Sequence, residues 1–207
     1  LLADGMAALP ATSMVPPGIP GRSQESFLPA YDPAGARRLL AEAGYVDPRT
    51  FPEVTLVTGG GGYDEAVLAQ LRDNLSITVR FETLDFATLL GRLGGEDSPD
   101  MWALSWIADY PSPNNFLGIL LGSDQSNNFG GWSNAAFDAA IAAAAGTDDP
   151  AAARAGYDAA EAILRDEVPT IPVSYGTSAA LAREGLLGAA SNGLGILRLA
   201  GLAWADR

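Results

Sequence analysis

The chain has 207 residues, of which 48% are hydrophobic and 18% charged, and this composition predicts a globular fold with one good core. Its formal net charge of −13 excludes nucleic acid and anionic membrane surfaces as expected partners, because both need basic patches on the protein. The sequence has no His and no Cys, which excludes disulfides, His/Cys zinc sites, and catalytic Ser-His-Asp or Cys-His arrangements.

Residues 1–30 are rich in Pro, Gly and Ala, and this composition predicts an extended or turning segment rather than a helix. The chain begins with Leu1 and has no initiator Met or signal-peptide pattern, so we expect a piece of a longer chain. No apolar run approaches the roughly 20 residues that a membrane-spanning helix needs.

Regular elements begin at Asp32, which is a suitable N-cap, and Pro33, which suits the first position of a helix; Gly44 is a suitable end. Further elements are predicted in this order: a strand at 53–58, a helix from Asp64, a strand at 77–81, a helix after Asp85, and a strand at 101–106. This alternation of helix and strand favours an α/β fold with a mainly parallel sheet and helices on both faces.

The second half of the chain is predicted to be mostly helical. Helices are expected to begin at Ser112-Pro113, at Ser133 and at Asp149-Pro150. The last of these helices places four side chains inward, namely Tyr157, Ala160, Leu164 and Val168. A strand at 170–175 follows, and an apolar tail covers 191–207.

The stretch 101–113 is the most informative part of the sequence. An apolar strand ends in Trp106, and Asp109 follows within a loop that Pro111 and Pro113 stiffen. In α/β proteins, loops at strand ends carry ligand contacts, and an aromatic wall beside one negative charge suits a ligand with a cationic end. Two other roles remain open from the residues alone: Asp109 can accept backbone N–H groups in a turn, and Trp106 can pack in the core.

Two further patterns carry weaker signals. Gly59, Gly60, Gly61 and Gly62 lie between a strand and a helix, as phosphate-binding loops do, but no Gly-Lys-Ser/Thr ending follows them. The acidic residues Glu96, Asp97 and Asp100 have neither the spacing of an EF-hand nor an aspartic-protease signature, so we expect a solvated loop.

Five stretches together resemble the C-terminal part of the family 5 extracellular solute-binding proteins, the peptide-type receptors of ABC importers. They are 15–21 (VPPGIPG), 31–45 (YDPAGARRLLAEAGY), 106–113 (WIADYPSP), 128 with 132–138 (WSNAAFD), and 159–161 with 168–173 (VPTIPV). Two positions depart from the family pattern. Ser76 stands where the family usually has Gly, and Ser112 stands where it usually has Asp.

The resemblance implies a type II periplasmic-binding-protein-like lobe that binds a ligand against a second, N-terminal lobe missing from this chain. It divides the sequence into 1–30, which leads from the missing lobe, 31–180, which forms the ligand-binding lobe, and 181–207, which returns toward the missing lobe. It also implies an extracytoplasmic location, periplasmic or lipid-anchored at the cell surface, and docking on a membrane permease.

The resemblance further implies that Asp109 pairs with the α-ammonium group of a small peptide. Trp106 is expected to wall the pocket, and the backbone of Ile107 and Ala108 is expected to pair with an extended peptide. The weaker candidates for ligand contact are Tyr110 and Asn128. We expect no cofactor, no metal site and no catalytic residue.

Alternatives remain open at this point. Peptides come first among ligands; nickel is disfavoured because the chain has no His, and sugars remain possible because Trp106, Trp132 and Tyr110 can stack on pyranose rings. An enzyme such as a glycoside hydrolase would need a second carboxylate roughly 5–9 Å from Asp109. A third alternative is a folded remnant without function.

Overall fold

The computed structural model describes residues 2–3, 6–60, 64–95, 97–177, 181–190 and 196–205. The chain divides into two compact units. The first unit consists mainly of Pro29–Ser105, and the second of Asp4–Leu28 together with Trp106–Arg207. The division expected from the sequence, into 1–30, 31–180 and 181–207, describes the lobes of a two-lobed protein and stays a prediction.

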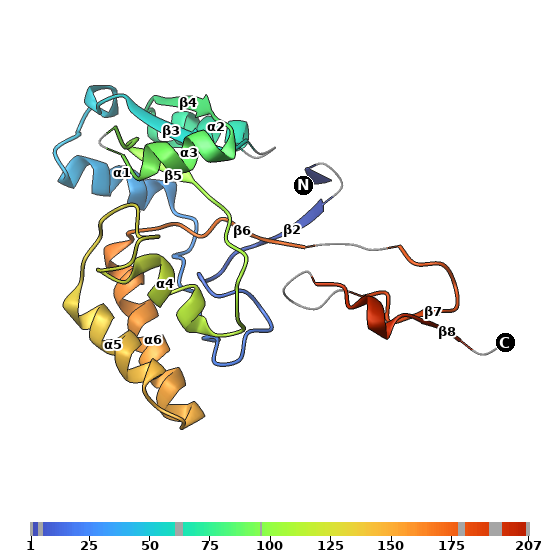
Figure 1. The fold of residues 1–207 in the computed structure, drawn as a ribbon. Helices are drawn as coiled ribbons and strands as arrows, with labels where there is room; N and C mark the ends of the chain where they lie inside the picture. The colour runs from blue at the N-terminus through green and yellow to red at the C-terminus, as the bar shows by residue number, and fades with distance from the viewer. Residues whose placement is uncertain are drawn as a thin grey trace. The chain divides into compact units, whose positions relative to one another are not determined.

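The first unit contains a three-stranded parallel sheet with β3 in its centre (Figure 1). Its strands are β3 (Val54–Thr58), β4 (Val79–Thr83) and β5 (Met101–Ala103). Its helices are α1 (Pro33–Glu42), η1 (Pro48–Thr50), α2 (Asp64–Leu75) and α3 (Phe86–Leu93). The predicted alternation of helices with parallel strands is therefore confirmed in this unit.

Local capping explains where two of these helices begin. The carboxylate of Asp32 accepts a hydrogen bond from the Gly35 N–H, and that of Asp85 accepts one from the Thr88 N–H. Each bond satisfies an N–H group that has no partner within its helix. Gly44 follows α1 with a φ of +99°, a left-handed conformation that ends the helix as the sequence predicted.

The turn after α2 adopts a conformation that favours glycine. Ser76 follows the helix with a φ of 56°, in the left-handed region, and its N–H donates to the Arg72 carbonyl. This is the position where the resembling family usually has Gly. Ser76 is exposed, so the strain of its Cβ is local to the turn.

Strand β5 is shorter than the predicted 101–106 and ends at Ala103. The cause is the length of its partner. Ala103 lies opposite Thr58, the last residue of β3, so the residues after Ala103 have no neighbouring strand with which to form hydrogen bonds. Trp106 consequently lies in a loop rather than at the end of a strand.

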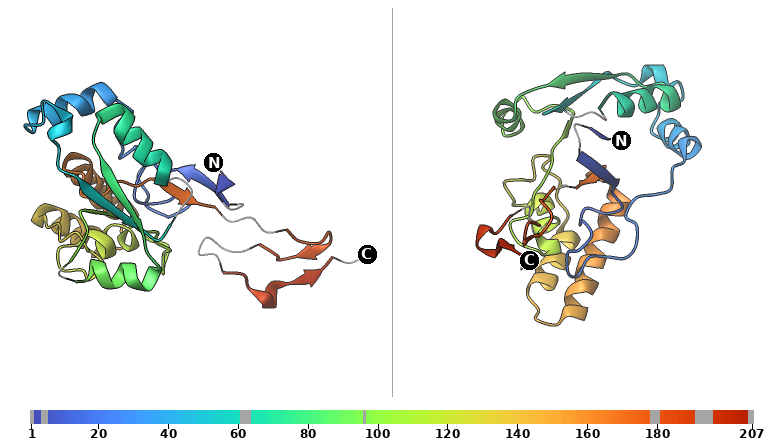
Figure 2. Two further views of the ribbon diagram at one scale, coloured as in Figure 1. Left: turned by 90° about the horizontal axis from the view of Figure 1, so that it is seen from above. Right: turned by 90° about the vertical axis from the view of Figure 1, so that its right-hand side faces the viewer.

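The second unit is mainly helical, and α5 and α6 lie side by side (Figures 1 and 2). Its helices are η2 (Pro113–Asn115), α4 (Gly118–Leu121), α5 (Ala135–Ala145), α6 (Pro150–Glu167) and η3 (Leu199–Gly201). Its core contains fully buried side chains from four parts of the chain, among them Val15, Leu117, Phe137 and Leu164. Helix packing therefore holds this unit together.

An antiparallel strand pair also belongs to the second unit. β2 (Met6–Pro10) pairs with β6 (Ser174–Gly176), so that Leu9 lies opposite Tyr175. The remaining strands are β1 (Leu2–Ala3), β7 (Leu186–Leu187) and β8 (Ala203–Trp204), the last two paired antiparallel. The strand predicted at 170–175 therefore begins later, at Ser174.

Two further predictions in this unit were wrong in detail. The cap of α5 is Asn134 rather than Ser133, because the Asn134 side chain accepts hydrogen bonds from the N–H groups of Ala136 and Phe137. Val168 does not face inward. It follows the end of α6 with a φ of 48° and is 49% exposed.

Among the described residues, no helix is both long and apolar enough to cross a membrane.

Candidate functional site

The predicted ligand corner, 106–110, lies in the second unit and its side chains alternate. Trp106 and Ala108 are partly buried and pack against the core of this unit. Ile107 is 77% exposed and Asp109 is also exposed. This short stretch therefore holds one set of side chains on the core and presents the other set outward, as an extended segment does.

The side chain of Asn115, which the sequence did not single out, fixes this corner. Asn115 is fully buried, and its Oδ1 accepts hydrogen bonds from the Trp106 ring Nε1 at 2.8 Å and from the Asp109 backbone N at 3.2 Å. One amide oxygen thus holds both the Trp106 indole and the backbone of Asp109, the two residues that were predicted to act together. An Asn in a Ser-Pro-Asn-Asn run is typical of a turn, so no local signal marks it as buried.

The carboxylate of Asp109 takes no part in this network. Within the described residues, no hydrogen bond or ion pair involves its oxygens, although its backbone N–H is held by Asn115. The backbone groups of Ile107 and Ala108 likewise have no recorded hydrogen bond within the described chain. An exposed carboxylate and backbone groups without such an internal bond are available to a ligand.

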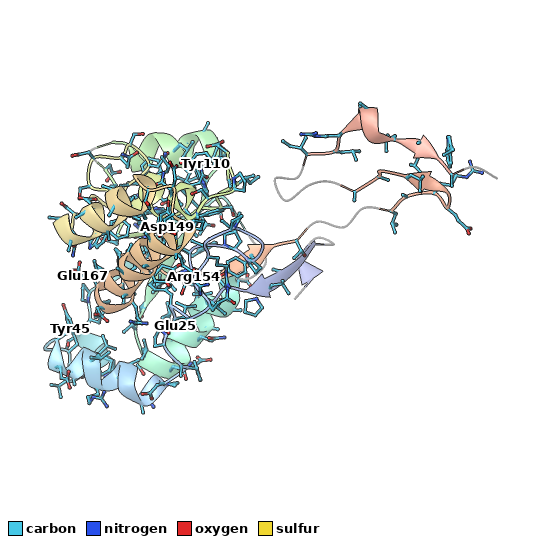
Figure 3. All side chains as sticks on the ribbon, turned by 90° about the horizontal axis from the view of Figure 1, so that it is seen from below. Glu25, Tyr45, Tyr110, Asp149, Arg154 and Glu167 are labelled. Carbon is cyan, nitrogen blue, oxygen red and sulfur yellow. The ribbon has the colours of Figure 1, made fainter. Side chains whose placement is uncertain are left out.

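The other two candidates have partners of their own. The hydroxyl of Tyr110, labelled in Figure 3, accepts a hydrogen bond from the Asn114 side chain at 3.0 Å, and Tyr110 is 39% exposed. The side-chain amide of Asn128 donates to the carbonyls of Gly122 at 3.2 Å and Trp132 at 2.7 Å. Asn128 therefore organises its own turn, and its role in ligand contact stays a prediction.

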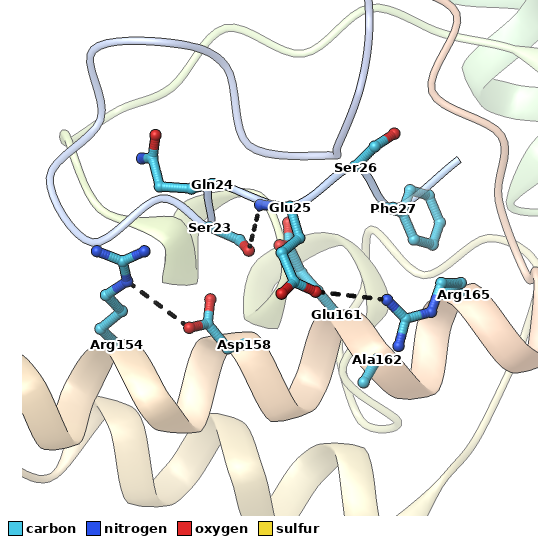
Figure 4. Close-up of a pocket in the computed structure, with 10 residues that line it drawn as sticks. All are labelled: Ser23, Gln24, Glu25, Ser26, Phe27, Arg154, Asp158, Glu161, Ala162 and Arg165. Carbon is cyan, nitrogen blue, oxygen red and sulfur yellow. Dashed lines mark hydrogen bonds and ion pairs between the residues drawn. The ribbon is translucent and has the colours of Figure 1, made fainter. Parts of the chain in front are cut away.

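One cavity in the second unit lies between the loop 23–27 and helix α6 (Figure 4) and has a volume of about 240 Å³. Arg154 approaches Asp158 at 3.6 Å, and Arg165 approaches Glu25 at 3.9 Å, both from the side of α6. Charged groups that already pair with one another leave little net charge for a guest. None of the expected ligand residues lines this cavity.

A second cavity of about 160 Å³ lies in the first unit, at the carboxyl ends of β3 and β5. Its lining includes Thr58, Phe86 and Leu104. Gly59 and Gly60 also line it, and Gly60 adopts a φ of +92° while its N–H donates to the Thr58 hydroxyl. Gly61 and Gly62 lie outside the described residues.

Glu161 of α6 is a buried carboxyl group outside the predicted corner. It is only 6% exposed, and its side chain bonds to the Ser13 hydroxyl, which also accepts the Val15 N–H. Burial raises the pKa of Glu161; the hydrogen bond from Ser13 opposes this rise, and the nearby charge of Asp158 adds to it. Glu161 therefore ties the segment around Ser13 to helix α6.

Asp97 and Asp100, two members of the acidic stretch considered above, contact different partners. Asp100 accepts a hydrogen bond from the Thr55 N–H at 2.8 Å, and the Asp97 carboxylate lies 3.9 Å from Arg92. Glu96 lies outside the described residues. Within the described part of the chain, no group of three or more acidic side chains is placed to hold a metal ion.

Fold and comparison with known proteins define the class. A murein tripeptide binding protein, MppA of Escherichia coli, superimposes with a TM-score of 0.81 at 25% sequence identity, over 97% of this chain and 41% of that one. The α/β fold is that of the type II periplasmic binding proteins. The family described as bacterial extracellular solute-binding proteins, family 5 Middle, matches residues 3–128, and the chain belongs to this family.

Curated relatives have names that refer to peptides. Di/tripeptide-binding protein 1 of Pseudomonas aeruginosa is 30% identical over 157 residues, which are 71% of this chain and 28% of that protein. Di/tripeptide-binding protein 2 of the same organism is 31% identical over 179 residues, or 83% of this chain and 33% of that protein. The chain thus spans about a third of the length of these relatives, which are named as binding proteins rather than enzymes.

Proposed function

We propose that this chain contributes to the binding of di- or oligopeptides for an ABC import system, as the C-terminal lobe of a two-lobed receptor outside the cytoplasm. In this proposal 31–180 forms the lobe, 1–30 and 181–207 connect to an N-terminal lobe, and a membrane permease receives the ligand. The names of its relatives support peptides as the ligand class. The chain performs no catalysis.

The observation that carries this proposal is the state of Asp109. Its backbone is held by Asn115, while its carboxylate is exposed and has no partner among the described residues. A fixed carboxylate pairs well with the α-ammonium group of a peptide, and each charge-assisted hydrogen bond contributes about 1.5–3 kcal/mol. Trp106 lies beside it, and Ile107 and Ala108 offer backbone groups for an extended peptide. Tyr110 and Asn128 complete the proposed contacts.

The test is a titration of the 207-residue chain with trialanine and with N-acetyl-trialanine, followed by NMR of the ¹⁵N-labelled protein. Two charge-assisted bonds correspond to about 3–6 kcal/mol, so we expect dissociation constants near the millimolar range. The acetylated peptide has no ammonium group and loses both bonds, so it should bind at least about a hundredfold more weakly. Calorimetry should detect no micromolar binding, because one lobe supplies only part of the contacts.

Two variants test whether the preference for a free amino group depends on Asp109. Asp109→Asn keeps the shape of the side chain but removes its charge, so both peptides should bind equally weakly. Asp124→Asn removes the same charge from another exposed position of the second unit and should leave the preference for the free amino group intact. A preference for trialanine that survives in Asp109→Asn would remove Asp109 from the site, and micromolar affinity of this chain alone would contradict the lobe assignment.

A further inference from the structure

The interaction of Asn115 with the ligand corner depends on the orientation of its side-chain amide. Both groups that face Oδ1 are N–H donors, namely the Trp106 indole and the Asp109 backbone amide. If the amide were turned over, its NH₂ group would face two donors, and both hydrogen bonds would be lost. The donors therefore determine which atom points at the corner.

The NH₂ group of the same amide lowers the stability of the fold. Asn115 is 0% exposed, and its Nδ2 is buried without an acceptor among the described residues. A buried donor without a partner destabilises a protein, and an apolar side chain of similar volume would avoid that loss. The benefit of Asn at this position therefore comes from the two bonds that its oxygen accepts.

These two bonds hold a segment that has little other support. The strand before it ends at Ala103, and the backbone of Ile107 and Ala108 has no recorded hydrogen bond within the described chain. The indole of Trp106 and the N–H of Asp109 are thus the points at which side-chain hydrogen bonds fix residues 106–109, while the Tyr110 hydroxyl bonds separately to Asn114. Loss of both bonds would allow Asp109 to sample several positions, although the core contacts of Trp106 would remain.

We propose that Asn115 is a positioning residue of the peptide site: its Oδ1 sets the Trp106 ring and the Asp109 backbone in one arrangement and so places the Asp109 carboxylate for the ligand ammonium group. The proposal rests on the peptide-binding function proposed above. Asn115 does not touch the ligand in this arrangement; it acts through the two residues that do.

The decisive variants separate the acceptor from the volume of the side chain. Asn115→Leu keeps the branching and the number of side-chain heavy atoms and removes the acceptor, whereas Asn115→Asp keeps the acceptor oxygen and replaces the unpaired NH₂ donor with a second carboxyl oxygen at the cost of a buried charge. Asn74→Leu makes the same change at a partly exposed position of the first unit and serves as the control. If Asn115→Leu loses its circular-dichroism spectrum, Asn115→Ala, which also lacks the acceptor, replaces it.

The first measurement needs no ligand. In Asn115→Leu, hydrogen exchange of the Trp106 indole proton and of the Asp109 amide proton should accelerate about tenfold relative to the wild type, because each has lost its acceptor. Asn115→Asp should exchange these two protons as slowly as the wild type, and Asn74→Leu should not alter them. Unchanged exchange in Asn115→Leu would overturn the proposal.

The second measurement is the titration with trialanine and its N-acetyl form. Asn115→Leu should lose most of the preference for the free amino group, as Asp109→Asn does, and Asn115→Asp should regain it. A full preference in Asn115→Leu would show that Asp109 needs no positioning and would overturn the proposal. If the wild-type chain shows no response to either peptide, the proposed function fails, while the exchange experiment still decides whether Asn115 holds the corner.

Discussion

Gly156 allows α5 and α6 to approach each other closely, and its replacement by Ala gives a sharp test of the second unit. A Cβ at this position of α6 would lie 2.8 Å from the Cβ of Ala144, 3.1 Å from the carbonyl oxygen of Ala140 and 3.2 Å from the Cα of Ala144. Carbon atoms in ordinary contact are about 3.5–4.0 Å apart, so the helices would have to separate by about 1 Å. Two of the three obstructing atoms belong to the backbone of α5 and cannot rotate away.

The expected magnitude follows from two opposing terms. Replacing Gly by Ala inside a helix stabilises it by about 1 kcal/mol, whereas overpacking a close interface costs about 1–3 kcal/mol. Because a separation of α5 and α6 disturbs the packing of Phe137 and Leu164, we expect the upper end of that cost. Gly156→Ala should therefore lower the free energy of unfolding by about 2 kcal/mol.

Urea unfolding followed by far-UV circular dichroism measures this change. With a slope of about 2 kcal/mol per M, the midpoint should fall by about 1 M at an unchanged slope. Ala155→Gly, at an exposed position of the same turn, calibrates the helix-propensity term. Ala144→Gly removes the nearest Cβ, so the double variant Gly156→Ala/Ala144→Gly should be about 1–2 kcal/mol more stable than the two single effects predict. A Gly156→Ala protein as stable as the wild type would refute the close packing of these helices.

Three further predictions follow from single contacts. Because burial raises the pKa of Glu161, the folded state binds its proton more tightly than the unfolded state does, so the stability of the wild type relative to Glu161→Gln should fall as the pH rises above about 4; a difference in unfolding free energy that is independent of pH would contradict this. Ser76→Gly should stabilise by about 0.5–1 kcal/mol in urea unfolding, whereas Ser76→Ala, which keeps the strained Cβ, should bring no gain. Asn134→Ala should destabilise by about 1 kcal/mol in the same assay, because two N–H groups of α5 lose their acceptor, and an unchanged midpoint would contradict that role.

The elements that the sequence predicted best are those specified by residues close together in the chain. Asp32 and Pro33 begin α1, and Asp149 and Pro150 begin α6, as capping chemistry requires. The alternation of helices with parallel strands in 33–103 was likewise predicted from periodicity alone. The caps join residues at most three apart, and the periodicity of each helix or strand is set within that element, so a local pattern contains the information.

The features that the sequence did not predict depend on distant residues. β2 and β6 pair although about 165 residues separate them, and β5 ends at Ala103 because its partner β3 ends at Thr58. Asn115 is buried beside Trp106, which packs against a core built from distant segments, so no local window reveals that burial. A turn-forming Asn and a buried amide that holds an indole look identical in a single sequence.

Asp109 combines a feature that neighbouring residues in the sequence reveal with one that depends on the folded structure. Its residue type and its place after Trp106 were visible in the sequence, and they indicate which chemical group is offered to a ligand. Its usefulness depends on where that carboxylate is held, and the structure assigns this task to the backbone N–H through Asn115 rather than to the side chain itself. An aspartate that used its carboxylate to accept N–H groups of the turn would have fewer lone pairs free for an ammonium group. Fixing the residue by its backbone leaves those oxygens available, and this division of roles within one residue is the physical reason for proposing that Asp109 binds a ligand.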